Sequence, residues 1–141
     1  MLEYRHLRPG QTPPADIERA PYRAVVIIEA DVTDHWRAVV SEWLIRSGCL
    51  YMLAWGVDCS LWDDSVDEAN LSVCGGSIPD EKFAYTTWHD SEPLEDVFWF
   101  AEHGAWHPDV DIQSTVLLHV AVEPRQRELM DAYVAAQDIH L

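Results

Sequence analysis

A cysteine, a histidine and two aspartates occupy positions from which they could form a nucleophilic site. Cys59 follows the turn at Gly56 and lies at or just before the N-terminus of a predicted acidic helix, where the helix dipole and free backbone amides lower the pKa of a thiol. His89 follows a later predicted strand and could act as its base, with Asp31 or Asp90 orienting the imidazole. The competing interpretation is a small buried thiol without a catalytic role, because neighbouring carboxylates oppose a thiolate.

The same helix could instead present a surface to another protein. Three of its acids, Asp63, Asp64 and Asp67, lie close to Trp62, and Trp88 ends the next predicted strand. The chain has seven Trp against three Phe, and Trp favours interfaces because its ring is apolar and its N–H is polar. Aromatic anchors in an acidic rim are typical of a hot spot for a basic protein. Alternatively, the acids form a solvated helix face and the Trp rings fill the core.

A histidine-rich segment contains side chains of the types that bind metal ions. Two histidines and two aspartates lie within nine residues: His103, His107, Asp109 and Asp111. Gly104 and Pro108 interrupt any helix that would bring them to one face, and no zinc or calcium motif is present. The sequence therefore predicts a loop here and no metal site.

Phosphate-bearing cofactors are not expected. No glycine-rich loop follows the first buried run, which ends in Glu29 and Asp31, and these charges would repel a pyrophosphate. Gly75 and Gly76 follow no strand and have no lysine beside them. We therefore expect no nucleotide or flavin cofactor.

Alternating strand and helix patterns indicate how these residues are positioned. Strands are predicted over 24–30, 49–55, 83–88 and 115–122, of which 83–88 is less apolar than the others. Helices are predicted over 34–47, from Ser60 onward, over 93–104 and over 124–137. Capping signals are Thr33 or Asp34, a Ser60–Asp63 pair, a left-handed Gly48, and Pro93 in a first turn. The pattern predicts a single-domain, three-layer α/β sandwich with a mainly parallel sheet of about four to five strands and helices on both faces.

The domain boundaries follow from the proline content. Residues 1–24 are expected to be a Pro-rich N-terminal arm, and residues 25–141 the α/β domain. Alternation of Leu2, Tyr4 and Leu7 also allows a short edge strand, and one antiparallel strand in the sheet remains open. Ligands of parallel sheets bind beyond the carboxyl ends of the strands. The residues expected there are Glu29, Asp31, Asp58, Cys59, Ser60, Trp88, His89, Asp90 and Glu123.

The charge is strongly negative and unevenly distributed. The formal net charge is −16, and residues 56–111 hold 14 acids against one base, Lys82. Such a field repels nucleic acid and anionic membranes, and it suits a basic protein partner. Three cysteines without a leader peptide indicate reduced thiols in the cytoplasm. No apolar run approaches the roughly 18 residues of a membrane span.

The sequence AWGVDCSLWDD at residues 54–64 and TTWH at residues 86–89 resemble small uncharacterised bacterial proteins that share this wording. The resemblance covers most of the chain after residue 24 and implies no activity. From the residues we expect an acidic cytoplasmic binding module that docks a basic protein, as an immunity or inhibitor protein would. The alternative is a small hydrolase or transferase that uses Cys59 and His89, or a carboxylate-held metal, at the carboxyl edge of the sheet.

Overall fold

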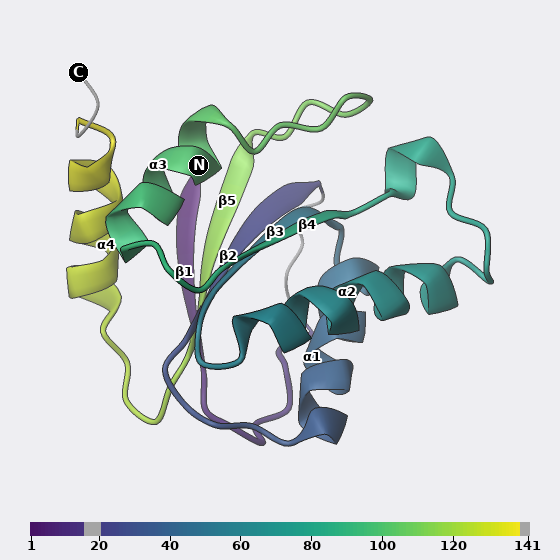
Figure 1. Ribbon diagram of the computed structural model, residues 1–141, viewed down its shortest axis with the longest axis horizontal. Coiled ribbons are helices and arrows are strands. Elements are labelled where there is room, and N and C mark those ends of the chain that lie inside the picture. Colours follow the sequence, from purple (N-terminus) through teal and green to yellow (C-terminus); the bar gives the residue numbers. More distant parts are fainter. Residues whose placement is uncertain (16–20, 139–141) are drawn as a thin grey trace.

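A computed structural model describes residues 1–15 and 21–138 of the chain. Strands and helices alternate from β2 onward, after a first strand at the N-terminus (Figure 1). The strands are β1 (Leu2–Leu7), β2 (Tyr22–Ile28), β3 (Cys49–Gly56), β4 (Tyr85–His89) and β5 (Ser114–Val120). The helices are α1 (Asp34–Arg46), α2 (Cys59–Val73), α3 (Leu94–His103) and α4 (Gln126–Ala136), with a 3₁₀ turn over Asp80–Lys82.

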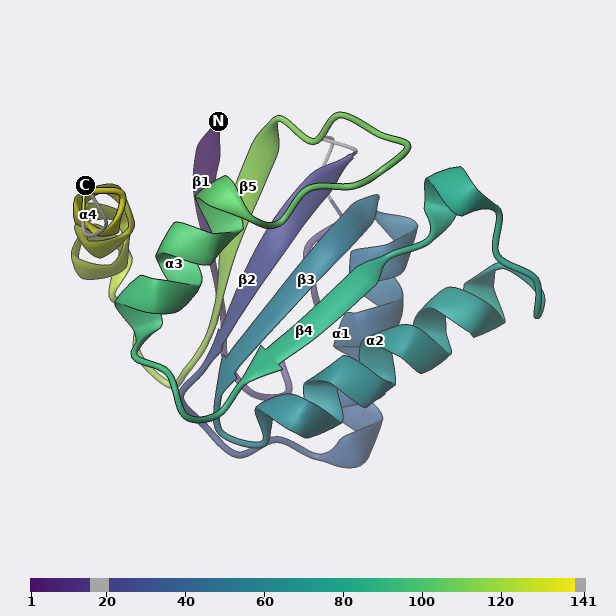
Figure 2. The ribbon, with the colours of Figure 1, turned by 45° about the horizontal axis from the view of Figure 1, so that its top comes forward.

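The strands of the described residues form one sheet in the order β1-β5-β2-β3-β4 (Figure 2). All pairs in it are parallel, so the antiparallel strand that the sequence left open does not occur in the described part of the chain. The chain runs outward from β2 through β3 to β4 and then crosses back to β5. Strand order therefore reverses between β2 and β5, which is where α/β sheets open a crevice at their carboxyl edge.

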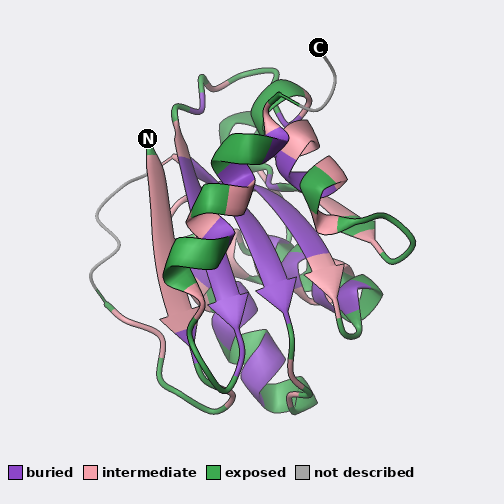
Figure 3. Ribbon diagram, turned by 90° about the vertical axis from the view of Figure 1, so that its left-hand side faces the viewer, coloured by how far each residue is buried: buried purple, intermediate pink, exposed green. Residues whose placement is uncertain are grey.

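Helices cover both faces of the sheet, which confirms the predicted α/β class. On one face α1 and α2 pack on side chains such as Val26 and Met52, and on the other α3 and α4 pack on Val25 and Leu53. All seven residues of β2 are buried, because this strand lies between two helical layers. The central strands are accordingly drawn as buried and β1 as half-buried (Figure 3). In the described residues, no helix is both long and apolar enough to cross a bilayer.

Helix α1 ends as predicted at both termini. The Thr33 hydroxyl accepts a hydrogen bond from the Trp36 N–H at 3.1 Å, and Gly48 follows the helix with a left-handed φ of 103°. Helix α2 differs from the prediction, because it begins at Cys59 and the N-cap is Asp58. The Ser60–Asp63 capping pair is therefore wrong. Asp58 adopts a left-handed φ of 53°, a conformation that Asp tolerates, and this starts the helix one residue early.

The N-terminal residues contribute an edge strand. β1 pairs with β5 from Leu2 to Leu7, in line with the alternation that allowed such a strand. β2 begins at Tyr22, inside the segment expected as an arm. Arg23 of β2 is buried, and its guanidinium donates to the Ala105 and Ile112 carbonyls. It thereby fixes the loop between α3 and β5.

The turn after β3 depends on Gly56. Its φ is +110°, and a Cβ built on it would lie 2.1 Å from the Ile28 carbonyl oxygen of the neighbouring strand. The next residue, Val57, donates its N–H to that same oxygen at 2.9 Å. Only a glycine lets the two backbones approach this closely.

We therefore expect Gly56→Ala to lower the free energy of unfolding by about 3 kcal/mol or more, from backbone strain and the clash with Ile28. Gly75→Ala is the control, because Gly75 also has a positive φ but its Cβ would meet nothing within 4 Å. That variant should lose only about 1–2 kcal/mol. Urea unfolding measures both, and equal losses would contradict the close approach.

Candidate functional site

The structure separates the two residues of the expected nucleophilic pair. Cys59 is 3% exposed and belongs to the core cluster beneath α1 and α2. His89 pairs in register with Trp55, whose side chain packs with the cluster on the opposite face of the sheet. Within the described residues, no hydrogen bond links Cys59 to a histidine. Cys59 therefore lacks a base and lies among apolar side chains.

The histidine has partners of its own. His89 Nδ1 lies 2.7 Å from Glu92 Oε1, and Nε2 lies 2.9 Å from Thr87 Oγ1. Asp31 and Asp90, the two expected orienting residues, are both exposed, and neither has a hydrogen bond to His89 among the described residues. The imidazole is thus held by the segment that links β4 to α3, and the predicted triad is not assembled.

A hollow of about 540 Å³ lies at the carboxyl edge of β2, β3 and β4. Its lining consists of Ile28, Glu29, Trp55, Gly56, Val57, His89, Asp90 and Glu92. Trp55 closes one side and donates its indole N–H to the Glu92 carbonyl at 2.8 Å. The hollow confirms that polar side chains collect at this edge. Across the described residues, however, no group of three or more His, Cys, Asp or Glu is arranged to hold a metal ion.

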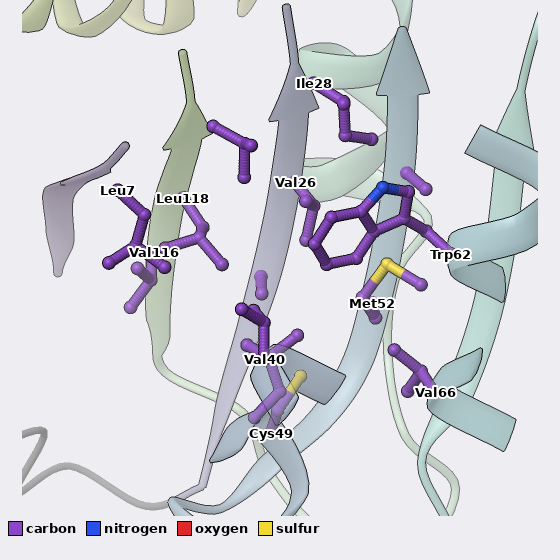
Figure 4. Packing of buried hydrophobic residues seen from close by; sticks show 14 of the residues in the cluster. Leu7, Val26, Ile28, Val40, Cys49, Met52, Trp62, Val66, Val116 and Leu118 are labelled. Carbon is purple, nitrogen blue, oxygen red and sulfur yellow. The ribbon is translucent and has the colours of Figure 1, made fainter. Parts of the chain in front are cut away.

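The expected protein-binding residues divide into buried and exposed ones. Trp62 is 0% exposed, and its indole ring lies over the sheet beside Val26 and Met52 (Figure 4). It also meets Trp36 edge to face at 6.3 Å, so it is a core residue and cannot be a surface anchor. Trp88, in contrast, is 48% exposed. The interpretation that Trp residues fill the core thus holds for Trp62 but not for Trp88.

The remaining residues belong to α2 and β4, two elements that pack against each other. Thr86 of β4 donates its hydroxyl to Asp67 of α2 at 2.7 Å, which fixes the helix against the strand. Trp88 lies two residues further along β4, so its side chain emerges on the same side of the strand as Thr86. Asp63 lies one helical turn before Asp67. We call this surface the α2–β4 acidic face, composed of Asp63, Asp64, Asp67, Thr86 and Trp88.

Negative charge is crowded on the α2–β4 acidic face. The pKa of Asp63 is raised above its ordinary value, first by partial burial and then by the negative charge of Asp67 and Asp64. A hydrogen bond from Thr86 opposes the shift only in part. A cationic group brought to this surface would relieve the repulsion, which makes the face complementary to basic side chains.

Sequence reasoning missed a hydrogen-bonded relay around the buried His119, at the point where strand order reverses. His119 of β5 is fully buried, with Nδ1 2.7 Å from the Tyr4 hydroxyl of β1 and Nε2 2.6 Å from Glu29 Oε1 at the end of β2. Arg125, which precedes α4, binds both oxygens of Glu29 at 3.1 and 2.7 Å. The Arg125 backbone N–H also donates to the Tyr4 hydroxyl oxygen at 3.0 Å.

The hydrogen bonds of this relay define its protonation state. Because the Tyr4 oxygen accepts from Arg125, its own proton is free to be donated to Nδ1 of His119, which leaves Nε2–H to donate to the Glu29 carboxylate. Burial lowers the pKa of His119, although Glu29 opposes this. Burial alone would raise the pKa of Glu29, but the hydrogen bonds from Arg125 and His119 outweigh it and hold that pKa low. Both directions favour a neutral imidazole beside a charged carboxylate.

Signals for this relay were only partial in the sequence. A histidine within an apolar run indicates a hydrogen-bonded core residue, and His119 is one. Tyr4 lies 115 positions from its partner His119 in the sequence, and Arg125 lies 121 positions from its partner Tyr4. A single sequence carries no signal that joins such distant residues. The relay is saturated with internal bonds, which favours a structural role in tying β1, β2, β5 and α4 together.

The histidine-rich loop is held by local contacts. His107 is buried, with Nε2 2.8 Å from the Phe83 carbonyl and Nδ1 accepting the Asp109 N–H at 3.1 Å. His103 is exposed and stacks on Trp99 at 4.5 Å. The two histidines thus make different contacts: His103 is the last residue of α3, and the residues that follow it form the predicted loop.

The relay makes stability depend on pH. Because the pKa of His119 is lower in the folded chain than its ordinary 6.5, the unfolded chain binds the extra proton, and stability is lost as pH falls from about 6.5 through the folded pKa. We expect the wild-type free energy of unfolding to fall by at most about 1.4 kcal/mol per pH unit from this site. His119→Gln should remove that component, whereas His35→Gln, at an exposed position of α1, should retain it. An unchanged slope in His119→Gln, measured by urea unfolding across pH, would show that the relay does not exclude the proton.

Comparison with known proteins supplies a family but no activity. No curated protein and no solved structure matches the chain. The family model described as "Domain of unknown function (DUF7684)" matches residues 2–136, which include every strand and helix described above. This match covers nearly the whole chain, so the protein belongs to the DUF7684 family of domains of unknown function.

Proposed function

We propose that this protein is a binding module that docks a basic protein partner through the α2–β4 acidic face, in the manner of an immunity or inhibitor protein. The observation that carries this is Trp88, a large aromatic side chain that is 48% exposed next to a row of carboxylates on α2. Interface hot spots are enriched in Trp, and acidic rims steer basic partners to them.

The distribution of charge supports the proposal. The segment from Gly56 to Asp111, which contains α2, β4 and α3, carries 14 acids and one base. That base, Lys82, lies in the 3₁₀ turn before β4, and its side chain makes no ion pair among the described residues. The acids are therefore not neutralised locally, so their field extends outward and accelerates encounter with a positively charged surface.

The proposal includes a cytoplasmic location, which the free thiols support. The three cysteines are free: Cys49 and Cys59 are buried, and Cys74 is half-buried. Burial raises the pKa of Cys49 to about 12, so this thiol stays protonated and inert. Such cysteines suit a reducing compartment, where they need no pairing.

Charge crowding on the acidic face predicts that Asp63→Asn stabilises the fold near neutral pH. Because the folded pKa of Asp63 is raised, its contribution to stability is present at acid pH and is lost as pH rises through that pKa. Removing the repulsion with Asp67, four residues along the same helix, should gain about 0.2–0.5 kcal/mol. The gain should vanish at acid pH. Asp109→Asn in a loop is the charge-matched control, and a loss of stability in Asp63→Asn at neutral pH would oppose this account.

The docking proposal is tested by affinity capture from cell extract with three forms of the protein. The wild type is compared with an acidic-face variant, Asp63→Asn/Asp64→Asn/Asp67→Asn, and with a charge-matched variant near α4, Glu123→Gln/Asp131→Asn/Asp138→Asn. We expect a basic protein to be retained by the wild type and the α4 variant, and its recovery to drop about tenfold or more in the acidic-face variant.

Salt dependence and the aromatic anchor complete this test. Raising the salt from about 0.1 M to about 1 M shortens the Debye length from about 10 Å to about 3 Å, so recovery should fall steeply. Trp88→Ala should weaken recovery without changing the salt dependence, because it removes contact area and no charge. Partners that are not basic, or that bind all three forms equally at every salt concentration, would refute docking through this face.

A further inference from the structure

The outer side of β4 has no strand beside it in the described residues. β4 is the last strand of the sheet and pairs only with β3. Its burial is correspondingly lower than that of the central strands, with Tyr85 and Trp88 exposed. An edge strand presents a row of unpaired N–H and C=O groups, which can template pairing with another chain.

The backbone groups that face outward can be identified from the ladder. Val57 donates its N–H to the Ile28 carbonyl across β2 and β3, so the backbone of Val57 is directed toward β2. Direction alternates along a strand, so Ala54 of β3 is directed toward β4. In a parallel ladder only one member of each register pair is directed at the other strand. Ala54 is in register with Trp88, so the N–H and C=O of Trp88 point outward, and those of Thr86 do too.

The side chain of Asn70 already occupies the outward backbone groups just before β4. Asn70 of α2 accepts the Ala84 N–H at 2.8 Å and donates to the Lys82 carbonyl at 3.0 Å. An added strand would make the same two contacts with its backbone; here the buried side-chain amide of Asn70 makes them. Past Ala84, at Thr86 and Trp88, no described residue hydrogen-bonds to the outward backbone groups.

The two edges of the sheet differ in their protection. β1, at the other edge, carries Glu3 and Arg5, which form an ion pair at 2.5 Å, and charges on an edge discourage pairing. β4 reads Tyr-Thr-Thr-Trp-His and carries no lysine, proline or bulge. Its β-branched and aromatic residues instead have high strand propensity. Past Asn70, β4 itself therefore carries no charged side chain, proline or bulge that would keep its edge unpaired.

Charge complementarity indicates the occupant. Acids lie beside β4 and at both of its ends: Asp63 and Asp67 on α2, Asp80 and Glu81 before the strand, and Asp90 and Glu92 after it. A second copy of this chain would bring the same acids and a net charge of −16 to the edge, so it is the wrong partner. An extended segment with alternating basic side chains would meet these acids while it hydrogen-bonds to Thr86 and Trp88.

We propose that β4 is a strand-addition site, and that a basic, extended segment of the partner pairs with the outward backbone groups of Thr86 and Trp88. The strand-addition proposal rests on the proposed docking of a basic protein and states how that protein binds. Backbone hydrogen bonds to the edge provide affinity, and the carboxylates of the α2–β4 acidic face, together with the indole of Trp88, select the side chains of the added strand.

Amide hydrogen exchange followed by NMR tests this with a defined probe. The probe is a short synthetic peptide of alternating lysine and valine, and its control alternates lysine and proline, which carries the same charge but cannot present a strand edge. In the free protein the Thr86 and Trp88 amides should exchange faster than those of Thr87 and His89, which face β3. The lysine–valine peptide should slow Thr86 and Trp88 by about tenfold or more, and the lysine–proline peptide should not.

Two variants at Thr86 test strand addition through the affinity of the lysine–valine peptide. Thr86→Pro removes an outward N–H without removing a bond to β3, whereas Thr86→Val keeps that N–H and removes only the hydroxyl that bonds Asp67. Peptide affinity should fall about tenfold in Thr86→Pro relative to Thr86→Val. Thermal unfolding establishes that both fold, and if Thr86→Pro does not fold, the exchange measurement on the wild type decides.

The outcomes distinguish the two proposals. If both peptides bind equally, weaken with salt and with the acidic-face substitutions, and leave Thr86 and Trp88 unprotected, strand addition is wrong and basic docking stands. If the lysine–valine peptide fails to protect these amides and the acidic-face variant still captures every protein that the wild type does, both proposals fail. If light scattering shows a dimer with both amides already protected in the free protein, the occupant is a second copy and the basic segment is excluded.

Discussion

Burial of a parallel sheet on both faces is the constraint on which the rest of this structure depends. The sheet interior is mostly apolar, so β2 is buried throughout, and the polar side chains that remain inside, such as Arg23 and His119, each need hydrogen-bond partners. The approach of Gly56 to Ile28 follows from the same constraint, because the chain must turn tightly from a buried strand into α2. The helix that results carries the acids to the outer side of β4.

Polar groups at two places in the sheet differ in whether the chain itself supplies their hydrogen-bond partners. At the reversal of strand order, Tyr4, Glu29, His119 and Arg125 satisfy one another and hold together elements from both ends of the chain. At β4 the hydrogen bonds stop after Asn70. The relay groups are hydrogen-bonded to one another, whereas the outward backbone groups of β4 past Asn70 are unpaired among the described residues. We therefore attribute stability to the relay and interaction to the edge of β4.

The fold was largely predictable from the sequence, because its signals are local. Runs such as residues 24–30 indicate buried parallel strands, and the Thr33 cap and Gly48 stop define α1. The start of α2 was misassigned because a left-handed Asp58 leaves no mark that distinguishes it from a loop residue. β1 could be proposed only as one alternative, since its pairing with β5 joins opposite ends of the chain.

The candidate site was less predictable, because it depends on which face each side chain occupies. Cys59 and His89 are both near the carboxyl edge, as expected, but the sheet lies between their side chains. Trp62 and Trp88 have the same chemistry in the sequence, yet one fills the core and the other is exposed. Asp63, Asp64 and Asp67 could be identified early, because three acids within five residues of a helix cannot all be buried.

Photo-cross-linking in living cells tests whether a basic partner docks on the α2–β4 acidic face. A photoreactive phenylalanine derivative replaces Trp88 on the acidic face in one protein and Val134, which is 64% exposed on α4, in another. The account predicts an adduct from position 88 that is absent from position 134, and mass spectrometry of the cross-linked peptide should find a segment with net positive charge. The same adducts from both positions, or an acidic cross-linked segment at position 88, would contradict it.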